Sequence, residues 1–367
     1  MMRAGEYNII LAGGGTGGHL YPAVAVAEQI SKLSPNSNIL FVGTKKKIES
    51  RIIPQMGFDF KSIWISGFSR KFNLKNLLFP FKVLVSLIQS FFISINFKPH
   101  VVVGAGAYVS GPIVWVSALL GSKIILLEQN SYPGVTNRIL QRKADRVHIS
   151  FKDSQKYFND NSKIRLTGNP VRTTLTIMER NDAIEKYSLD VNKKVLLVIG
   201  GSLGAGNLNK AIAENLEVLI NNDIQVIWQT GERYFKEYSN LNSNTIKVFQ
   251  FISNMSEAYS CCDLLLARAG ATTIAETAFL GIPTIFVPST NVAANHQYKN
   301  AKSLVDDNAG MMIEDSNLLK NLSQIILETI SNSDLLSTLS NNIKKYSKPN
   351  AAEEIALDVL QLAEVKS

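Results

Sequence analysis

Two glycine-rich segments and one histidine are the parts of this 367-residue sequence whose spacing points most directly to chemistry. The first segment, residues 13–18, reads GGGTGG and is followed directly by His19. Glycines let backbone N–H groups approach an anion closely, and the start of a following helix adds a partial positive charge. An imidazole at that place can take the proton of an attacking hydroxyl near neutral pH. We therefore predict an anionic ligand here, with His19 as the candidate general base.

The spacing Gly13-x-Gly15-x-x-Gly18 also matches the fingerprint of dinucleotide-binding proteins. That fingerprint needs an acidic residue at the end of the second strand, where it holds a ribose. Here the predicted second strand, residues 39–42, is followed by Gly43, Thr44 and three lysines, and the nearest acid, Glu49, comes later. The pattern therefore favours a general anion site over an NAD or FAD site.

The second glycine segment, residues 200–206, reads GGSLGAG and follows a predicted strand at 194–199. It contains G-x-S-x-G, and the order Ser202, Asp263, His296 suits the triad of a serine hydrolase. A hydrolase leaves the first glycine segment without a role, and it needs this strand in the middle of one sheet. We favour a phosphate cradle in which the Ser202 hydroxyl and the loop amides donate to phosphate oxygens.

A third segment, residues 267–276, reads ARAGATTIAE and follows a predicted strand at 264–266. A helix that begins at 271–273 directs its first N–H groups toward an anion. Glu276 then presents a carboxylate that can accept two hydrogen bonds from a ribose, unless it only complements the helix dipole. Further on, Asn295, His296 and Gln297 open another helix, where amide side chains can recognise a sugar.

Short apolar runs alternate with helical segments along the whole chain. Strands are predicted at 8–11, 39–42, 101–103, 124–127 and 146–149, with a helix at 22–33, and the pattern restarts with strands at 194–199, 225–228, 247–249, 264–266 and 284–287. Continuously apolar strands alternating with helices indicate parallel sheets covered on both faces. We therefore predict an α/β chain of two doubly wound domains, joined near 168–190, with a tail helix at 351–363 that Asn350 and Glu353 cap.

Composition and charge narrow the classes of function. Hydrophobic residues make up 46% and charged residues 19%, which excludes a disordered chain. Residues 1–168 hold 21 Lys and Arg but 8 Asp and Glu, whereas residues 169–367 hold 17 and 22, so the first half favours an anionic partner. Basic residues are not interleaved with aromatic ones, so nucleic acid is not expected. Cys261 and Cys262 are neighbours and are expected to be reduced thiols in the cytosol, and no secretory signal is recognised.

Residues 72–97 form the most apolar segment of the chain. Lys82, Ser86, Gln89, Ser90, Ser94 and Asn96 recur along it at steps of three and four, and Pro80 interrupts it. That periodicity indicates a helix with a polar stripe rather than a membrane span. We expect it to cover the first sheet and to leave an apolar patch, flanked by Arg70, Lys71 and Lys75, that rests on an anionic membrane surface.

Taken together, the motifs resemble those of the MurG family of glycosyltransferases. The resemblance runs through residues 14–19, 106–112 (GAYVSGP), 128–130, 168–172, 200–205, 270–276 and 295–297. It implies a GT-B fold, two Rossmann-like doubly wound domains that face each other across a cleft. Residues 1–168 would form the lipid-acceptor and membrane side, residues 169–348 the UDP-sugar side, and residues 349–367 a helix that packs back on the first domain.

The resemblance also implies a reaction. It is the inverting transfer of N-acetylglucosamine from UDP-N-acetylglucosamine to an undecaprenyl-pyrophosphoryl muramoyl-pentapeptide, lipid I to lipid II, in peptidoglycan synthesis. The enzyme would be peripheral, at the cytoplasmic face of the inner membrane. Acceptor contacts carry over to Tyr108 and Ser110, and UDP-sugar contacts carry over to Thr16, Gly17, Gly18, Asn130, Arg172, Ser202, Ile252, Ala271, Thr272, Thr273, Ile274, Ala275, Glu276 and Gln297.

Three positions depart from the family pattern: Leu203 stands where a glutamine is usual, Ala107 where a glycine is usual, and Ala269 where a serine is frequent. No D-x-D motif occurs in the sequence, so we expect catalysis without a metal ion or other cofactor. Alternative functions are those of other GT-B nucleotide-sugar enzymes, such as a glycolipid synthase or an epimerase.

Overall fold

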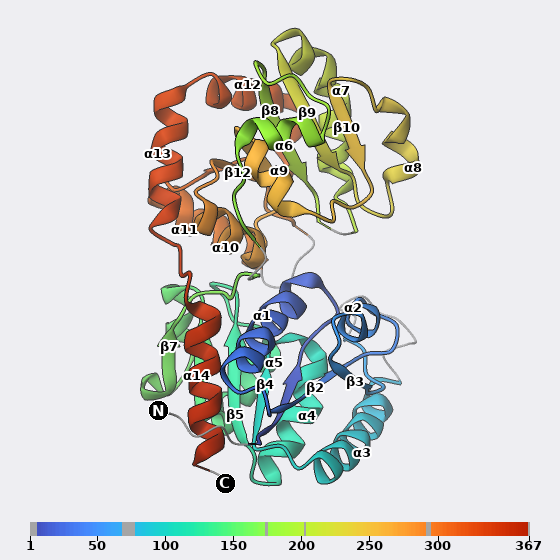
Figure 1. Ribbon diagram of the computed structural model, residues 1–367, viewed down its shortest axis with the longest axis vertical. Coiled ribbons are helices and arrows are strands. Elements are labelled where there is room, and N and C mark those ends of the chain that lie inside the picture. The colour runs from blue at the N-terminus through green and yellow to red at the C-terminus, as the bar shows by residue number, and fades with distance from the viewer. Residues whose placement is uncertain (1–5, 68–77, 173–174, 202, 291–294, 366–367) are drawn as a thin grey trace. The chain divides into compact units, whose positions relative to one another are not determined.

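The chain forms two compact units (Figure 1). In the computed structural model one unit comprises residues 1–172 with 348–367, and the other comprises residues 173–347. The structure describes residues 6–67, 78–172, 175–201, 203–290 and 295–365. The predicted Ser202, Arg70, Lys71 and Lys75 therefore lie outside the described residues.

The first unit is built on a seven-stranded, wholly parallel sheet of order β3-β2-β1-β4-β5-β6-β7. Its strands are β1 (Asn8–Ala12), β2 (Asn38–Gly43), β3 (Asp59–Ser62), β4 (Val101–Gly104), β5 (Lys123–Glu128), β6 (Arg146–Ile149) and β7 (Ile164–Leu166). The five predicted strands are confirmed, most of them extended by one or two residues. The two edge strands, β3 and β7, were not predicted because they are short and their side chains are mostly exposed, without a run of buried apolar residues.

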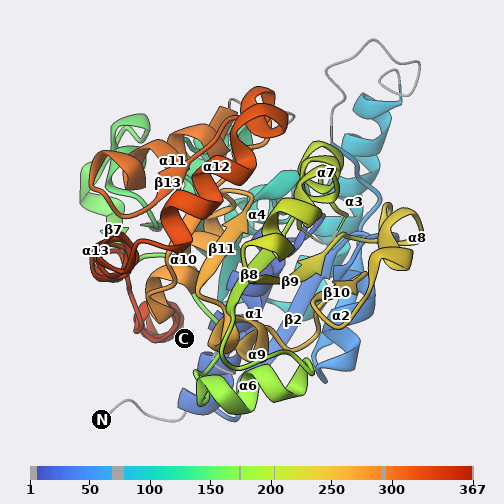
Figure 2. The ribbon, with the colours of Figure 1, turned by 90° about the horizontal axis from the view of Figure 1, so that it is seen from above.

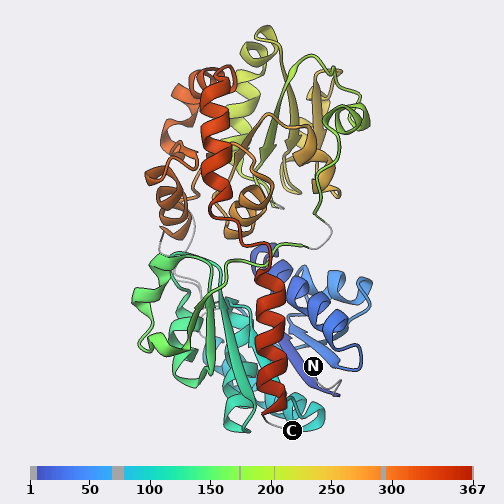
Figure 3. The same ribbon diagram turned by 60° about the vertical axis from the view of Figure 1, so that its left-hand side comes forward.

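Helices cover both faces of this sheet. They are α1 (Gly17–Leu33), α2 (Glu49–Gln55), α3 (Phe79–Phe97), α4 (Ala107–Leu119), α5 (Val135–Leu140) and α14 (Ala351–Glu364). On one face α1 and α14 lie side by side and bury their apolar residues against Ile9 and Leu11 (Figure 3). On the other face α4 packs against Ile10 and Ala12. The helix α1 begins five residues before its predicted start, so Pro22 lies inside it.

The second unit has a six-stranded parallel sheet of order β10-β9-β8-β11-β12-β13. Its strands are β8 (Lys194–Ile199), β9 (Ile224–Gln229), β10 (Ile246–Phe249), β11 (Leu264–Ala267), β12 (Thr284–Phe286) and β13 (Met311–Met312), and its helices are α6 (Arg180–Lys186), α7 (Gly206–Asn221), α8 (Phe235–Tyr238), α9 (Met255–Cys261), α10 (Ala271–Leu280), α11 (His296–Asp306), α12 (Leu318–Ile330) and α13 (Ser333–Lys344). Leu196 and Val198 of β8 meet α7 and α12 on one face, and Figure 2 shows β8 and β9 beside α7.

Both sheets reverse their strand order at one place, between β1 and β4 in the first unit and between β8 and β11 in the second. Ligands of doubly wound sheets bind at the carboxyl ends of the strands at such a point. The segments that lie there are residues 13–18, of which Gly17 and Gly18 begin α1, and 105–106 in the first unit, and the described residues of 200–205 (all but 202) and 268–270 in the second. The topology thus brings each predicted glycine loop to the position where a ligand is expected.

The tail helix α14 belongs to the first unit and is anchored by burial and by one polar pair. Ile355, Val359 and Leu360 are buried in its core. Asp358 Oδ2 lies 3.2 Å from Nε2 of the buried His148 on β6, and this imidazole holds the pKa of Asp358 below its usual range. The side chain of Asn350 makes no capping bond, so the predicted cap is absent and packing holds the helix.

We predict that Asp358→Asn destabilises the first unit by about 1 kcal/mol at pH 7, the difference between a hydrogen bond to a charged and to a neutral acceptor. A lowered carboxyl pKa stabilises the folded state above the ordinary Asp value of 3.8, and this contribution disappears as the pH falls through the lowered value. The difference between wild type and variant in the free energy of unfolding, measured in urea, should therefore shrink below about pH 4.

Glu354→Gln is the matched control, since it removes one carboxylate from the exposed side of the same helix. It should change the free energy of unfolding by a few tenths of a kcal/mol. An Asp358→Asn penalty that stays constant down to pH 2 would show that the contact between Asp358 and His148 does not anchor the helix.

Candidate active site

His19 lies in the first turn of α1, and its ring is fixed by two oxygen atoms. Nδ1 is 3.1 Å from the Ala105 carbonyl oxygen and 3.1 Å from Oε1 of Gln129. Both oxygens only accept hydrogen bonds, so the network assigns the proton to Nδ1. Nε2 is then the basic nitrogen, as a general base requires.

Two neighbours hold this imidazole in place. Gln129 is buried and its amide Nε2 donates to the Ala105 carbonyl (3.0 Å), which turns its Oε1 toward His19. Gly106 lies under the ring with φ of 90°, and a Cβ atom there would come within 2.8 Å of His19 Nδ1. Gln129 was not predicted as a site residue, because its contact with His19 spans 110 positions of sequence.

Glu128, at the end of β5, organises the loop that carries Asn130. Its carboxylate accepts hydrogen bonds from the backbone N–H groups of Asn130 (3.0 Å) and Gly134 (3.0 Å) and from Asn137 Nδ2 (2.8 Å). Burial raises the pKa of Glu128, and these hydrogen bonds oppose the rise. The sequence motif 128–130 therefore contains two residues that position others and one, Asn130, that is half-buried.

The remaining predicted residues of the first unit differ in how accessible they are. Thr16 is exposed at the cap of α1, ahead of Gly17 and Gly18, and its carbonyl accepts from the N–H of His19. Tyr108 is half-buried, and burial, followed by the charge of Glu49, raises its pKa. Ser110 is fully buried, with its hydroxyl donating to the Gly106 and Ala107 carbonyls. Arg172 places its guanidinium 4.9 Å from the ring centre of Tyr21.

In the second unit the first backbone N–H groups of α10 are available as hydrogen-bond donors at the end of β11. Gly270 is its cap, and its first turn carries no acidic residue. Arg268 fixes the loop before it, because its Nη1 lies 2.6 Å from Oδ1 of the buried Asp315. Within the described part of the chain the Thr272 hydroxyl is buried without a hydrogen-bond partner. Thr273 and Ala271, with Ile274 and Ala275, complete the predicted segment on this helix.

Glu276 lies in the second turn of α10 and is buried, 4% exposed. The hydroxyl of Tyr259, on α9, donates to its Oε2 at 2.9 Å. An acid that complements the helix dipole lies in the first turn, and Glu276 lies beyond it. Its oriented carboxylate is therefore better suited to accept hydrogen bonds from a vicinal diol. Tyr259 is a second residue that the sequence did not reveal.

Two other predicted residues of this unit have partners inside it. The N–H of Ile252 donates to Oε1 of Gln229 at 2.9 Å. Oε1 of Gln297, on α11, accepts from the N–H of Ser289 at 2.8 Å. The predicted UDP-sugar residues thus divide into two groups, one at the strand ends of each unit.

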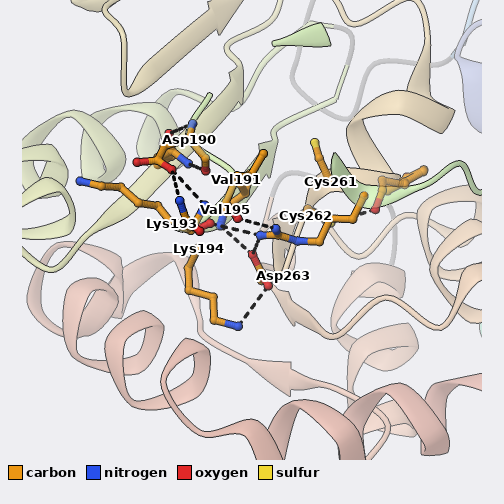
Figure 4. A network of polar contacts seen from close by, with 12 residues as sticks. Asp190, Val191, Lys193, Lys194, Val195, Cys261, Cys262 and Asp263 are labelled. Atoms are coloured by element: carbon orange, nitrogen blue, oxygen red, sulfur yellow. Dashed lines mark hydrogen bonds and ion pairs between the residues drawn. The ribbon is translucent and has the colours of Figure 1, made fainter. Parts of the chain in front are cut away.

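The serine-hydrolase alternative is wrong. Asp263 precedes β11, at the end of the sheet where β8 begins (Figure 4), whereas Gly200 and Gly201, the described start of the G-x-S-x-G segment, follow the other end of β8. A six-residue strand separates the two positions by roughly 20 Å. The carboxylate is also fully engaged, since it accepts from Arg180 Nη2 (2.9 Å), Lys194 Nζ (3.2 Å) and the N–H of Val195 (2.8 Å).

The cysteines beside Asp263 are free, and burial raises the pKa of Cys261 to about 12. A thiol of this kind is not a nucleophile at neutral pH. Over the described ranges, no group of three or more His, Cys, Asp or Glu side chains is arranged to hold a metal ion.

Comparison with known proteins gives the same picture for both units. Residues 9–149 match the glycosyltransferase family 28 N-terminal domain, and residues 195–355 match the C-terminal domain of that family. The chain is 40% identical to a UDP-N-acetylglucosamine–N-acetylmuramyl-(pentapeptide) pyrophosphoryl-undecaprenol N-acetylglucosamine transferase of Flavobacterium psychrophilum, over 98% of each chain. It is 41% identical to the transferase of the same name from Cytophaga hutchinsonii, over 97% of each.

A solved structure resembles the fold as a whole. The crystal structure of Acinetobacter baumannii MurG has a TM-score of 0.73 and 28% identity, with coverage of 97% of this chain and 99% of that chain. The predicted α/β class, with one parallel sheet in each unit, is therefore confirmed by both the topology and this likeness.

Proposed function

The chain belongs to the MurG family of glycosyltransferase family 28, and we propose that it catalyses the reaction for which its relatives are named. The donor is UDP-N-acetylglucosamine and the acceptor is the undecaprenyl-pyrophosphoryl muramoyl-pentapeptide. The observation that carries the proposal is the pair of strand-end sites, one with an oriented imidazole and one with a buried carboxylate behind a helix start.

The second unit supplies the features that a nucleotide sugar needs. The Glu276 carboxylate, oriented by Tyr259, accepts hydrogen bonds from the two ribose hydroxyls. The first N–H groups of α10 and the amides of loop 200–205 donate to the diphosphate. Ile252 follows β10, and Gln297 lies in the first turn of α11, after β12. By the family resemblance we assign contacts with UDP-N-acetylglucosamine to both residues.

In the reaction an acceptor hydroxyl attacks the anomeric carbon as the bond from that carbon to UDP breaks. The electron pair of the breaking bond leaves with the diphosphate, whose charge the helix starts and Arg172 stabilise. The hydroxyl proton passes to Nε2 of His19, while Nδ1–H remains bonded to Ala105 and Gln129. Because no D-x-D motif is present, we propose that these groups act without a metal ion.

A surface of the first unit suits a lipid acceptor. By length and composition α3 is the one helix in the described residues that could cross a bilayer. Its serines Ser86, Ser90 and Ser94 are buried against the protein, and Ser94 bonds Ser117 of α4 at 2.8 Å. The serines of the predicted polar stripe therefore face inward, whereas Lys82 and Gln89 are half-buried and Asn96 is exposed.

The opposite side of α3 is apolar and exposed. We call it the apolar face; it comprises Phe81, Leu84, Ile88, Phe91, Phe92 and Ile95. Lys82 lies beside it, 5.9 Å from the ring centre of the exposed Trp64. An apolar stripe with flanking cations is typical of a helix that lies in a membrane interface. We propose that the enzyme rests through this face on the cytoplasmic leaflet of the membrane that holds its acceptor.

We expect the purified protein to transfer labelled N-acetylglucosamine from UDP-N-acetylglucosamine to a muramoyl lipid acceptor in excess chelator. UDP-N-acetylglucosamine should compete best for the donor site, with UDP-glucose and guanine nucleotides much weaker. Release of free sugar or its epimer without transfer to lipid would favour an epimerase. Loss of transfer in chelator, with recovery on adding Mg²⁺, would contradict metal independence.

His19→Ala should lower kcat by about 10²–10⁴-fold with little change in the affinity for UDP-N-acetylglucosamine, since it removes only the base.

Gln129→Glu places a carboxylate beside Nδ1 of His19 and favours the imidazolium form of that ring. The acid limb of the kcat/KM profile should then move to higher pH by about one unit.

Gln361→Glu, which adds the same charge on the exposed side of α14, is the control and should leave the profile unchanged. If His19→Ala changes only substrate affinity, His19 positions the substrate and another group takes the proton.

Replacing one stripe of the apolar face (Leu84→Ser, Ile88→Ser and Phe92→Ser together) should weaken binding to vesicles that contain anionic lipid by at least tenfold. Each of these side chains is about half exposed, so each contributes on the order of 1 kcal/mol when lipid covers it. Co-sedimentation at low and high salt measures the effect, and salt should weaken the wild type. The double variant Val218→Ser and Leu319→Ser, on exposed helices of the second unit, should bind as wild type does.

A further inference from the structure

Glu49 is a buried carboxylate that the mechanism above does not use. It is the first residue of α2, is 1% exposed, and lies close to the first glycine loop. Its Oε2 accepts the N–H of Gly15 at 2.9 Å. Its Oε1 accepts the N–H of Thr44 at 2.9 Å and the Thr44 hydroxyl at 2.7 Å. The carboxylate therefore joins the end of β2 to the loop after β1.

Two glycines, Gly14 and Gly43, pack their backbones directly against the side chain of Glu49. A Cβ atom at Gly14, where φ is 153°, would lie 2.4 Å from Glu49 Cδ. A Cβ atom at Gly43 would lie 2.5 Å from Glu49 Cγ. Real Cβ atoms do not approach so closely, so the packing of Glu49 requires glycine at both positions, and at Gly43 the ring of Phe60, 2.8 Å away, adds to this.

This contact changes what the first glycine loop can bind. In dinucleotide-binding proteins the amides of such a loop face the pyrophosphate. Here the Gly15 amide already holds an anion, and that anion is part of the chain. A dinucleotide is thereby disfavoured, because its phosphates would meet both an occupied donor and a negative charge.

The loop is held from its other side by the site itself. A Cβ atom at Gly13 would lie 2.9 Å from Cβ of Ala105, the residue whose carbonyl binds His19. The Thr16 carbonyl accepts the N–H of His19 at 3.3 Å. A shift of the loop away from Glu49 would therefore move His19 as well.

Tyr108 is the second group that Glu49 affects. A Cβ atom on Gly15 would be 3.8 Å from the Tyr108 hydroxyl, so the phenol lies over the loop. The Thr44 hydroxyl, a partner of Glu49, also lies near the Tyr108 hydroxyl. The loop, Thr44 and Tyr108 thus meet around one carboxylate.

We propose that Glu49 is a positioning residue of the transfer reaction. It is a built-in anion that holds loop 13–18, and through it His19 and Tyr108, in the geometry for the acceptor before any substrate binds. This inference rests on the proposed function, because it assigns the loop to the acceptor hydroxyl and its base.

The test is Glu49→Gln, which keeps the shape of the side chain and removes its second acceptor. The amide oxygen can still accept both donors of Thr44, but the NH₂ group then faces the N–H of Gly15, donor against donor. We expect kcat to fall by about 10–100-fold, as for a base displaced by a fraction of an ångström. KM for UDP-N-acetylglucosamine and calorimetric binding of UDP should change less than about threefold, because the ribose contact and most of the diphosphate contacts proposed above lie in the second unit.

Hydrogen exchange gives a readout that does not depend on the reaction. Without any substrate, the peptide that spans residues 13–19 should exchange its amides at least tenfold faster in Glu49→Gln than in the wild type. If the wild type shows no transfer, the proposed function fails. The exchange measurement then still tests whether the contact between Glu49 and Gly15 holds the loop. Unchanged exchange together with unchanged kcat would overturn the role of Glu49.

Two further variants separate positioning from folding. Asp59→Asn removes an exposed carboxylate from the same unit and should leave both readouts as in the wild type. Thr44→Val removes one of the three hydrogen-bond donors to Glu49. We expect it to lower kcat and to speed amide exchange by about 3–10-fold. This variant provides the test if Glu49→Gln does not fold. A drop in kcat that only parallels a loss of UDP binding and of folded protein would also overturn the proposal.

Discussion

Backbone N–H groups at the starts of helices are the feature on which the rest of this structure depends. The helices that follow the four strands at the two reversal points, α1, α4, α7 and α10, carry no acidic residue in their first turns. A first-turn carboxylate would neutralise the helix dipole from within the helix. Its absence at all four places leaves these donors for groups that come from elsewhere, and parallel sheets buried on both faces are what gather them at one edge.

The two units use this common arrangement in different ways. In the first unit one loop donor is taken by Glu49, and the imidazole of His19 is oriented by oxygens of Ala105 and Gln129. In the second unit the buried carboxylate, Glu276, lies further along α10 and leaves the helix start itself unopposed. We propose that one strand-end site serves proton transfer and the other binds the nucleotide, although both derive from the same strand–glycine loop–helix pattern.

The sequence was sufficient to predict the central strands, both glycine loops and the helix start at Ala271, because each is marked by a local pattern. It was not sufficient for the edge strands β3, β7 and β13, which are short and partly exposed. It also missed Gln129, Tyr259 and Glu49, whose importance lies in contacts with residues 110, 17 and 34 positions away. In a single sequence such residues have no signal of their own, and the fold alone brings them to the site.

The sequence of helix α3 predicts its polar and apolar stripes but not which of them faces the protein. Its serine stripe and its apolar residues were both visible in the sequence, but periodicity does not say which side faces the protein. Small hydroxyl residues let α3 pack closely on α4, and Ser94 and Ser117 satisfy each other there. Among the described residues the side chains of the apolar face remain 38–56% exposed, although exposing such a stripe to water is unfavourable. We propose that a lipid surface covers this face, which would also bring the enzyme to the membrane that holds a polyprenyl acceptor.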